Sequence, residues 1–294
     1  MNLSDDEGVA RLIQAAKQED LGDGDLTTAL MADAAAPASF RLHAKQRGVF
    51  AGCEVAGLVV AAYDESIQIE WSNSAPDGFV IETVPTVLAT IQGPLGSILS
   101  AERVLLNFLQ RLSGIATVTR EYVDAVEDTT ATIYDTRKTT PGWRVLERYA
   151  VRVGGGSNHR DGLYDAVLIK DNHLAGIETD RLAAAVFEML NRLPQSGRQP
   201  AFVMVEADDL AQVAALLSVV GIDVILLDNF SCEGLRQAVA MRDEYGAGGK
   251  VALEASGGIT LPMVREVAQT GVDRISVGAL THSAPSLDLS LERV

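Results

Sequence analysis

The sequence has little cysteine and no long apolar run, and each absence excludes a class of protein. Cys53 and Cys232 are the two cysteines in 294 residues, and they lie far apart without forming a CxxC pair. This excludes a disulfide framework and a zinc site built on cysteine pairs, and it fits a reducing compartment. The longest apolar run, Val55–Tyr63, is far shorter than the roughly 20 residues that a helix needs to span a bilayer.

Basic residues are also scarce. The chain has 24 Lys and Arg against 40 Asp and Glu, which gives a formal net charge of -16 and a pI of about 4.6. This balance argues against DNA, RNA or an anionic membrane surface as the main partner. The first residues, MNLSDDEGVARL, lack the basic and apolar segments of a signal peptide, so we expect a cytoplasmic protein.

One segment reverses the overall charge. Residues 135–173 hold seven of the 24 Lys and Arg residues against five Asp and Glu, together with two histidines and a Gly-Gly-Gly run. A nucleic-acid binder spreads positive charge over a face, whereas a compact basic site in an acidic protein suits a small anion. The segment therefore predicts an enzyme that acts on an anionic metabolite.

The first part of the chain mixes helices and short strands. A helix is expected from a cap at Ser4 to about Gln18, because acidic residues follow the cap and suit the positive end of a helix. Short β-type runs over residues 40–91 are interrupted by an apolar helix at Cys53–Tyr63. An amphipathic helix is expected at Leu95–Leu112. This pattern predicts an α+β layer.

From Thr132 onward, strands alternate with helices. The expected strands are TIYDT, AVLIK, FVMVE, VILLD, VALEAS and RISVG, with helices expected at 180–193, 208–219, 232–244 and 262–270. Strands rich in Val, Ile and Leu with helical connections are typical of a parallel sheet that is buried on both faces. The length allows two domains, or one barrel with an added domain.

Charged or special residues stand at the carboxyl end of every expected strand. They are Asp135 with Arg137 and Lys138, then Lys170, Glu206, Asp228, Glu254 with Ser256, and Gly278. A single polar residue at a strand end is routine, because strand ends meet water. Five or six in register favour the catalytic rim of an α/β barrel.

Three glycine segments add candidate anion sites. The run Gly154–Gly156 is explained by a plain turn when taken alone, but Asn158, His159 and Arg160 follow it and place polar donors at the bend. The segment ASGGI, followed by Pro262 at a helix start, offers a hydroxyl and backbone amides to a phosphate. For this segment, and for the glycine of SVGALTHS, a tight turn between strand and helix remains an equal alternative.

Nine ordered blocks carry a resemblance to a known family. The chain resembles the quinolinate phosphoribosyltransferases, also called nicotinate-nucleotide pyrophosphorylases (carboxylating), which are type II phosphoribosyltransferases. The blocks are EDLGDGDLTT, GVFAGCEVA, SAERVLLNFLQRLSGIAT, DTRKTTPG, GGGSNHR, LYDAVLIKDNH, LLDNF, EASGGI and VGALTHS, and they extend from Glu19 to Ser283.

The resemblance implies a fold and a reaction. It implies an α/β protein with an N-terminal α/β sandwich at residues 1–112, on which the tail 280–294 packs back, and a seven-stranded, TIM-like α/β barrel at 113–279. The family joins quinolinate to phosphoribosyl pyrophosphate with Mg²⁺, and it forms nicotinate mononucleotide, pyrophosphate and carbon dioxide in NAD biosynthesis. It also implies a homodimer with active sites shared across the interface.

Site residues follow from the matching motifs. The resemblance implies a quinolinate pocket of Arg103, Arg137, Lys138, His159, Arg160 and Lys170. It implies an acidic pair near the ribose and the metal ion, Glu206 and Asp228, and phosphate-binding turns at Ser256, Gly257, Gly258 and Gly278. Of these residues, Lys138, Lys170, Glu206 and Asp228 are the expected catalytic groups.

The chain departs from the family pattern at three positions, and two alternative functions stay open. Met204 stands where the family commonly has Glu, Trp143 replaces a smaller apolar residue, and Ala255 replaces a frequent Ser. One alternative is a paralogue of the same fold with another substrate, such as the molybdenum-transport-associated relatives, which tend to depart from the DTRK and LIKDNH blocks. The other is a non-catalytic anion-binding barrel, in which Lys170, Glu206 or Asp228 would be lost.

Overall fold

The computed structural model describes residues 3–72, 75–246 and 251–294, which form two compact units. Unit 1 takes in the described residues of 1–120, 138–155 and 280–294, and unit 2 takes in those of 121–137 and 156–279. The sequence predicts one domain of residues 1–112 together with the tail 280–294, and a second domain of residues 113–279. The structure also groups 280–294 with the N-terminal residues, but unit 1 extends to residue 120 and includes segment 138–155.

Unit 1 is built on a four-stranded antiparallel sheet in the order β12-β1-β5-β3. Its strands are β1 (Pro37–Ala44), β3 (Gln68–Trp71), β5 (Thr86–Pro94) and β12 (Leu289–Arg293), and a separate pair consists of β2 (Gly48–Val49) and β4 (Val80–Ile81). Phe40, Leu42 and Ala44 alternate along β1 and are buried, as expected for a strand with one face on a core.

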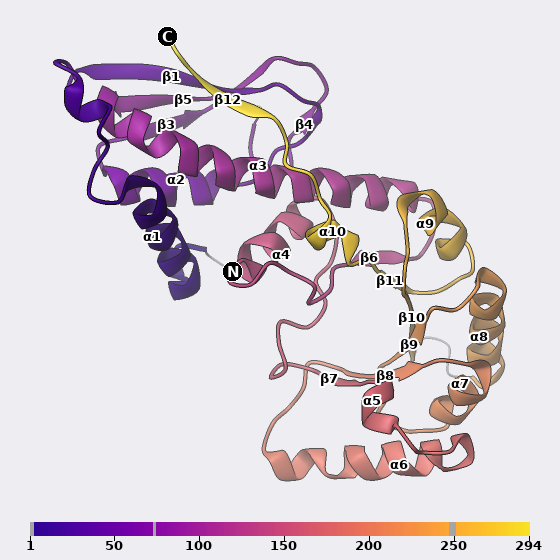
Figure 1. Cartoon of the computed structure of the whole chain (residues 1–294). Coiled ribbons are helices and arrows are strands. Elements are labelled where there is room, and N and C mark those ends of the chain that lie inside the picture. The colour runs from indigo at the N-terminus through magenta and orange to yellow at the C-terminus, as the bar shows by residue number, and fades with distance from the viewer. Residues whose placement is uncertain (1–2, 73–74, 247–250) are drawn as a thin grey trace. The chain divides into compact units, whose positions relative to one another are not determined.

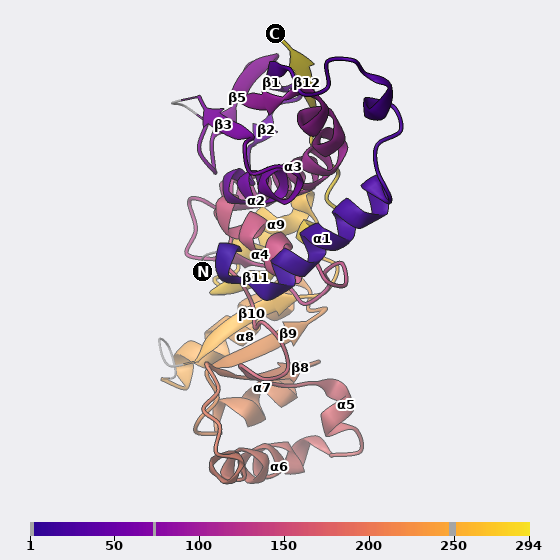
Figure 2. The same ribbon diagram turned by 90° about the vertical axis from the view of Figure 1, so that its left-hand side faces the viewer.

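The edge of this sheet is formed by the last strand of the chain. Residues Phe40–Ala44 of β1 pair with Leu289–Arg293 of β12, and Figure 2 shows β12 beside β1. The first and last strands of unit 1 are therefore neighbours, although the sequence of unit 2 comes between them.

The helices of unit 1 include one whose start differs from the prediction. They are α1 (Glu7–Leu21), α2 (Cys53–Tyr63), most of α3 (Leu95–Ala125) and α4 (Arg144–Val153), with 3₁₀ turns at Leu3–Asp5 and Thr28–Leu30. The predicted cap at Ser4 is wrong. Asp6 caps α1, because its carboxylate accepts the amides of Gly8 and Val9, while Ser4 lies in the preceding 3₁₀ turn.

Helix α3 is longer than the sequence predicts, ending at Ala125 and not near Leu112. The second half of α3 contains threonines, which are weak helix formers, so its helical pattern is harder to recognise in the sequence. In the structure the hydroxyls of Thr117 and Thr119 donate to backbone carbonyls one turn earlier in the helix. Gly114 is required there, because a Cβ at this position would lie 1.9 Å from the carbonyl oxygen of Pro285.

Unit 2 is built on a parallel sheet in the order β6-β11-β10-β9-β8-β7. The strands are β6 (Thr132–Tyr134), β7 (Val167–Ile169), β8 (Val203–Ala207), β9 (Val224–Asp228), β10 (Ala252–Ser256) and β11 (Arg274–Ser276). All six strands expected from the sequence are confirmed. They pair because their Val, Ile and Leu side chains are buried on both faces, as in β8, where every residue is buried.

The predicted seventh strand is wrong as a regular strand. Next to β6, its position is held by a single parallel bridge between Tyr134 and Ser157, in which Ser157 donates to the carbonyl of Ile133 and accepts from the amide of Asp135. Three glycines and a polar turn surround Ser157, so this stretch lacks the apolar residues that would extend the bridge into a strand.

Helices cover the outer side of the parallel sheet, as Figure 1 shows. They are α6 (Thr179–Asn191), α7 (Leu210–Leu217), α8 (Cys232–Glu244) and α9 (Leu261–Ala268). Unit 2 also contains a short α5 (Asp171–Leu174) and a 3₁₀ turn at Leu193–Ser196, whereas the turn α10 (Ala279–His282) lies almost wholly in unit 1. The four long helices confirm those expected from the sequence. Across the described residues, none of the helices combines the length and apolar character needed to cross a membrane.

Candidate functional site

The carboxyl ends of the six parallel strands meet at one edge of unit 2. Lys170 follows β7, Glu206 and Asp228 lie at the ends of β8 and β9, and Ser256 ends β10. The register places Ser256 opposite Asp228 and Glu206 opposite Leu226. Because all strands run in the same direction, the predicted residues of this unit share one edge, which is where open and closed α/β sheets carry their sites.

An acidic cluster occupies part of this edge. Oxygen atoms of Glu206, Asp208 and Asp228 lie within 4.8 Å of one another. The Nζ atom of Lys170 lies 3.5 Å from Oε2 of Glu206. Glu206 is buried, while the Lys170 side chain is half exposed. Asp208 was missed by the sequence reasoning, although it stands two residues after Glu206 and so projects from the same side of an extended chain.

The surroundings of Glu206 suit a bound cation. Burial raises the pKa of the Glu206 carboxyl, and the neighbouring carboxylates of Asp228 and Asp171 act in the same direction, while Lys170 opposes them. A divalent cation would relieve this repulsion, and carboxylate oxygens are the ligands that Mg²⁺ prefers. The donor set of Glu206, Asp208 and Asp228 therefore fits the metal that the resemblance implies.

The stability of unit 2 should depend on the ionisation of Glu206. Because its folded-state pKa is raised above the ordinary 4.5, its contribution is fully present below that value and is lost as the pH rises through the folded value. Glu206→Gln cannot ionise, so we expect its stability relative to the wild type to increase as the pH rises above 4.5. Urea unfolding in the presence of a chelator measures this difference in the free energy of unfolding. If this free energy changed equally with pH in both proteins, the raised pKa of Glu206 would be contradicted.

The basic part of the edge is organised by Asp135, which is fully buried after β6. Its carboxylate accepts the amide of His159 at 2.6 Å and the side-chain amide of Asn158 at 2.7 Å. This holds the turn Asn158–Arg160 against the segment that carries Arg137. Asp135 was noted as a strand-end residue, but its positioning role requires the folded turn.

Arg160 is a buried cation beside another cation. Its side chain is almost fully buried, and one Nη atom donates to the carbonyl of Ala166 at 3.4 Å. Burial lowers the pKa of the Arg160 guanidinium, and the charge of Arg137 lowers it further. Two like charges held together in this way are suited to an anion with two negative groups.

The glycine turn after β10 is required by close packing. Gly257 and Gly258 have φ values of 95° and 60°, a region that favours glycine. A Cβ at Gly257 would lie 2.2 Å from Oδ1 of Asn229, whose amide donates to the carbonyl of Ser256. The tight-turn interpretation therefore explains Gly257, and the turn leads into α9, which begins at Leu261.

Unit 1 contains the two remaining predicted residues. Arg103 lies on α3 and Lys138 follows Arg137, and both are exposed within the chain. The carbonyl of Lys138 accepts a hydrogen bond from the Thr281 hydroxyl at 2.8 Å. The structure therefore distributes the predicted site residues over both units.

A buried carboxylate holds the segment that begins at Lys138. Glu147 of α4 is fully buried and accepts from the amide of Thr140 at 3.1 Å and from its hydroxyl at 2.9 Å. Arg111 of α3 donates to Oε1 of Glu147 at 2.7 Å and also to the carbonyls of Thr281 and Ala284. These contacts explain why segment 138–155 belongs to unit 1.

Removing the Glu147 carboxylate should strongly destabilise the protein. We expect Glu147→Ala to lower the free energy of unfolding by about 3–5 kcal/mol, because it leaves a partly buried arginine without its partner. The control is Glu233→Ala, which removes an exposed carboxylate 3.8 Å from Arg236 and should cost about 1 kcal/mol or less. Equal urea midpoints for the two variants would contradict the assigned role of Glu147.

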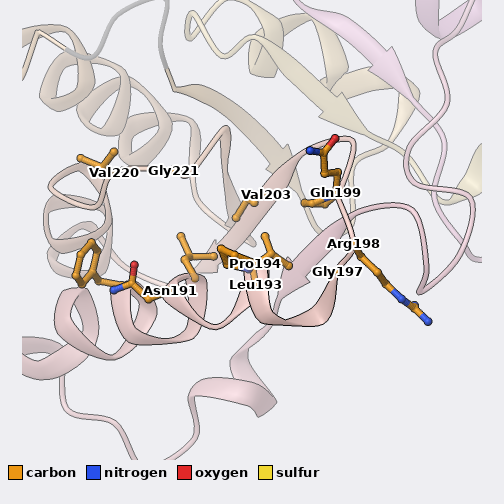
Figure 3. Close-up of a pocket in the computed structure, with 12 residues that line it drawn as sticks. Asn191, Leu193, Pro194, Gly197, Arg198, Gln199, Val203, Val220 and Gly221 are labelled. Carbon is orange, nitrogen blue, oxygen red and sulfur yellow. The ribbon is translucent and has the colours of Figure 1, made fainter.

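An apolar hollow of about 580 Å³ lies at the other end of the parallel strands. Figure 3 shows its walls, which include Leu193 and Pro194, Val203 at the start of β8, and Val220 and Gly221 before β9. These positions mark the amino ends of β8 and β9. The hollow is therefore separate from the candidate site at the carboxyl ends.

Sequence comparisons cover nearly the whole chain. The family model described as quinolinate phosphoribosyl transferase, C-terminal domain, matches residues 115–292, and the model for the N-terminal domain matches residues 25–113. The chain belongs to the quinolinate phosphoribosyltransferase family.

Relatives within this family have similar lengths. The nicotinate-nucleotide pyrophosphorylase (carboxylating) of Mycobacterium leprae is 41% identical over 284 residues, which cover 95% of each chain. The probable enzyme of the same name from Bacillus subtilis is 40% identical over 93% of this chain and 89% of its own length. The solved nicotinate-nucleotide pyrophosphorylase of Francisella tularensis is 37% identical, with a TM-score of 0.86 over 98% of this chain and 96% of that chain.

The three departures from the quinolinate phosphoribosyltransferase pattern are accommodated by packing. Met204 is fully buried against Val224 and Leu226. Trp143 stacks on Phe108 with ring centroids 4.7 Å apart, and Ala255 is buried within β10. Each of these side chains thus packs in apolar surroundings.

Proposed function

We propose that the chain transfers the phosphoribosyl group of phosphoribosyl pyrophosphate to quinolinate, with loss of one carboxylate as carbon dioxide. The products are nicotinate mononucleotide and pyrophosphate. The observation that carries this proposal is the presence, at the rim of one parallel sheet, of the buried Arg160 beside Arg137 and of a cluster of three carboxylates. A dicarboxylate and a sugar that develops positive charge require these opposite environments. The names of relatives at 40% and 41% identity support the assignment.

Several fixed cations are needed for quinolinate, which has two adjacent carboxylates. Following the family motifs, we assign the quinolinate pocket to Arg103, Arg137, Lys138, His159, Arg160 and Lys170, with the arginines and lysines as its cations. A hydrogen bond to a charged group contributes about 1.5–3 kcal/mol, so about four such contacts suffice for micromolar affinity. A bound dianion also removes the repulsion that lowers the pKa of Arg160.

The carboxylates act on the sugar. As the ring nitrogen of quinolinate attacks the ribose carbon that loses pyrophosphate, positive charge develops on the ribose, and Glu206 and Asp228 stabilise it. Glu206, Asp208 and Asp228 would hold Mg²⁺, which when bound neutralises charge on the departing pyrophosphate. Lys170, 3.5 Å from Glu206, keeps this carboxylate ionised and placed.

Neutral donors can bind the phosphate oxygens. We assign them to the hydroxyl of Ser256 and the backbone amides of Gly257, Gly258 and Gly278, in turns where the chain can approach an anion closely. Once the ring nitrogen is quaternary, the neighbouring carboxylate leaves as carbon dioxide. The electron pair left on the ring carbon is stabilised by the adjacent positive nitrogen and then takes up a proton from water, which gives nicotinate mononucleotide. The chain therefore needs no covalent nucleophile.

We further propose a homodimer in which Arg103 serves the partner's site. Arg103 is exposed on α3 among the buried residues Val104, Leu105, Leu106 and Phe108. Within the described ranges it has no ion pair, so the alternative of a salt bridge to Glu102 lacks support. An exposed arginine on an apolar helix suits a subunit interface, where arginine is enriched.

The test is product analysis with purified protein. We expect mass spectrometry to detect nicotinate mononucleotide from quinolinate and phosphoribosyl pyrophosphate when Mg²⁺ is present, and none after chelation. Turnover of nicotinate at the same rate would contradict the two-carboxylate pocket. Binding of quinolinate without product would favour the non-catalytic anion-binding barrel, and no binding of quinolinate would favour a paralogue with another substrate.

A further inference from the structure

A buried ion pair lies inside unit 2 and has no role in the function proposed above. Glu254 of β10 and Arg274 of β11 are register partners in the parallel sheet, so their side chains leave it on the same face. The Nε atom of Arg274 lies 2.7 Å from Oε2 of Glu254. Glu254 is fully buried. Because desolvation offsets much of the attraction in such a pair, stability alone is a weak reason for its presence.

Aromatic rings fix the arginine of this pair. The guanidinium of Arg274 lies 3.9 Å from the ring centroid of Tyr134 and 5.4 Å from that of Phe202. The Phe202 ring also meets the ring of His159 edge-on, with centroids 5.7 Å apart. The arginine, and through it the Glu254 carboxylate, is therefore held in one place.

His159 connects the pair to the turn that carries Arg160. Its Nε2 lies 3.4 Å from Oε1 of Glu254, and its Nδ1 accepts the backbone amide of Arg160 at 2.8 Å. A ring nitrogen that accepts a hydrogen bond carries no proton, so the proton of the neutral ring resides on Nε2 and faces the carboxylate.

We propose that Glu254 is a positioning residue for Arg160. It selects the tautomer of His159 with the proton on Nε2, and the free Nδ1 then holds the backbone amide of Arg160. Together with Asp135, which accepts the amide of His159, it fixes the turn through two buried carboxylates. This inference rests on the proposed function, because it concerns the guanidinium that is assigned to quinolinate.

Glutamine at position 254 cannot serve both neighbours. Its single oxygen can accept from Arg274 or from His159, and its amide group must then face the other donor. Arg274 cannot release a proton, so the oxygen turns to Arg274 and the imidazole moves its proton from Nε2 to Nδ1. An Nδ1–H then faces the amide of Arg160, and the contact that holds this residue is lost.

The experiment follows the tautomer and the affinity separately. Long-range ¹H–¹⁵N spectra are suitable because the chain has four histidines, and His159→Gln identifies the signal. We expect the Nε2–H form in the wild type and the Nδ1–H form in Glu254→Gln. Calorimetry with benzene-1,2-dicarboxylate, which has two adjacent carboxylates and no reactive nitrogen, should give a Kd raised roughly 10–100-fold, as for a displaced binding group. The KM for quinolinate should rise, and the KM for phosphoribosyl pyrophosphate should not.

Rescue and control variants separate this role from loss of stability. In Glu254→Gln/Arg274→Met, the glutamine oxygen is free for His159, so the Nε2–H form and the affinity should return. If Glu254→Gln does not fold, Glu254→Leu/Arg274→Met removes both charges and should lose the tautomer preference and the affinity. The control, Arg242→Met, removes a buried arginine whose Nη1 lies 2.5 Å from a carboxylate oxygen of the partly exposed Asp273, and it should leave the tautomer and the affinity unchanged.

An unchanged tautomer and an unchanged Kd in Glu254→Gln would overturn the proposal, and so would a double Gln/Met variant that binds as weakly as the single one. The tautomer spectra and the Kd measurements do not require turnover. If the wild type makes no nicotinate mononucleotide, the proposed function fails, while the tautomer result still decides the role of Glu254.

Discussion

Lys170→Ala should lower kcat/KM for quinolinate by about 10²–10³, the loss found when one preorganised charged donor is removed. Lys170 follows β7 at the carboxyl edge of the sheet, and its Nζ lies 3.5 Å from Glu206. Alanine removes a cation from the proposed dicarboxylate pocket and leaves Glu206 without its positive neighbour. The free energy of unfolding should change little, because the lysine side chain is half exposed.

A matched lysine provides the control. Lys45 lies in unit 1 with its Nζ 2.7 Å from Oε1 of Glu292, and both side chains are exposed. Lys45→Ala removes the same charge and the same number of atoms, so it should retain wild-type kinetics. Steady-state assays of both variants decide the matter: a Lys170→Ala enzyme with wild-type kcat/KM would place the pocket elsewhere.

Mixing two inactive proteins should restore activity. Arg103→Ala and Lys170→Ala homodimers should each be nearly inactive, because each lacks one proposed quinolinate cation in both sites. If Arg103 serves the partner's site, a mixed dimer has one site with both lesions and one intact site. Such a dimer should then regain about half of the wild-type activity, as expected for sites shared across a two-fold interface.

The measurement requires mixed dimers that are isolated before the assay. Co-expression of the two variants with different affinity tags, followed by two purification steps, yields mixed dimers alone. The control is a mixed dimer of Lys170→Ala and Glu206→Gln. Both positions lie in unit 2 and serve the site of their own chain, so each site keeps one substitution and the two variants should not complement each other. An inactive Arg103/Lys170 mixed dimer would show that Arg103 acts within its own chain.

The parallel sheet could be predicted because most residues of its longer strands are apolar. In β8 and β9, the runs VMVEA and VILLD are apolar except for one acidic residue near the end of each, and short apolar runs rich in Val, Ile and Leu are typical of strands buried on both faces. Helix α4 was missed, although Leu146, Ala150 and Val151 recur at helical spacing and are buried. Its buried face also includes Glu147, whose partner Arg111 lies on another helix and is found only in the folded structure.

The rim residues could be predicted for a similar reason. Parallel strands have their carboxyl ends at one edge, so Lys170, Glu206 and Asp228 are brought close by direction alone. The contact between Glu254 and Arg274 could not be predicted in this way. It depends on the register of β10 against β11, and a shift of one residue would place the two side chains on opposite faces.

The pairing of β12 with β1 has a consequence for synthesis on the ribosome. Residues 289–293 emerge after all of unit 2, so unit 2 has its complete sheet while β1 still lacks its outer neighbour. Until then, β1 presents unpaired amide and carbonyl groups along an apolar strand, which can template pairing with another nascent chain. We therefore expect a translational pause just before β12 to lower the yield of native protein more than an equal pause within unit 2. A chaperone that covers the exposed edge of β1 during this pause should restore the yield.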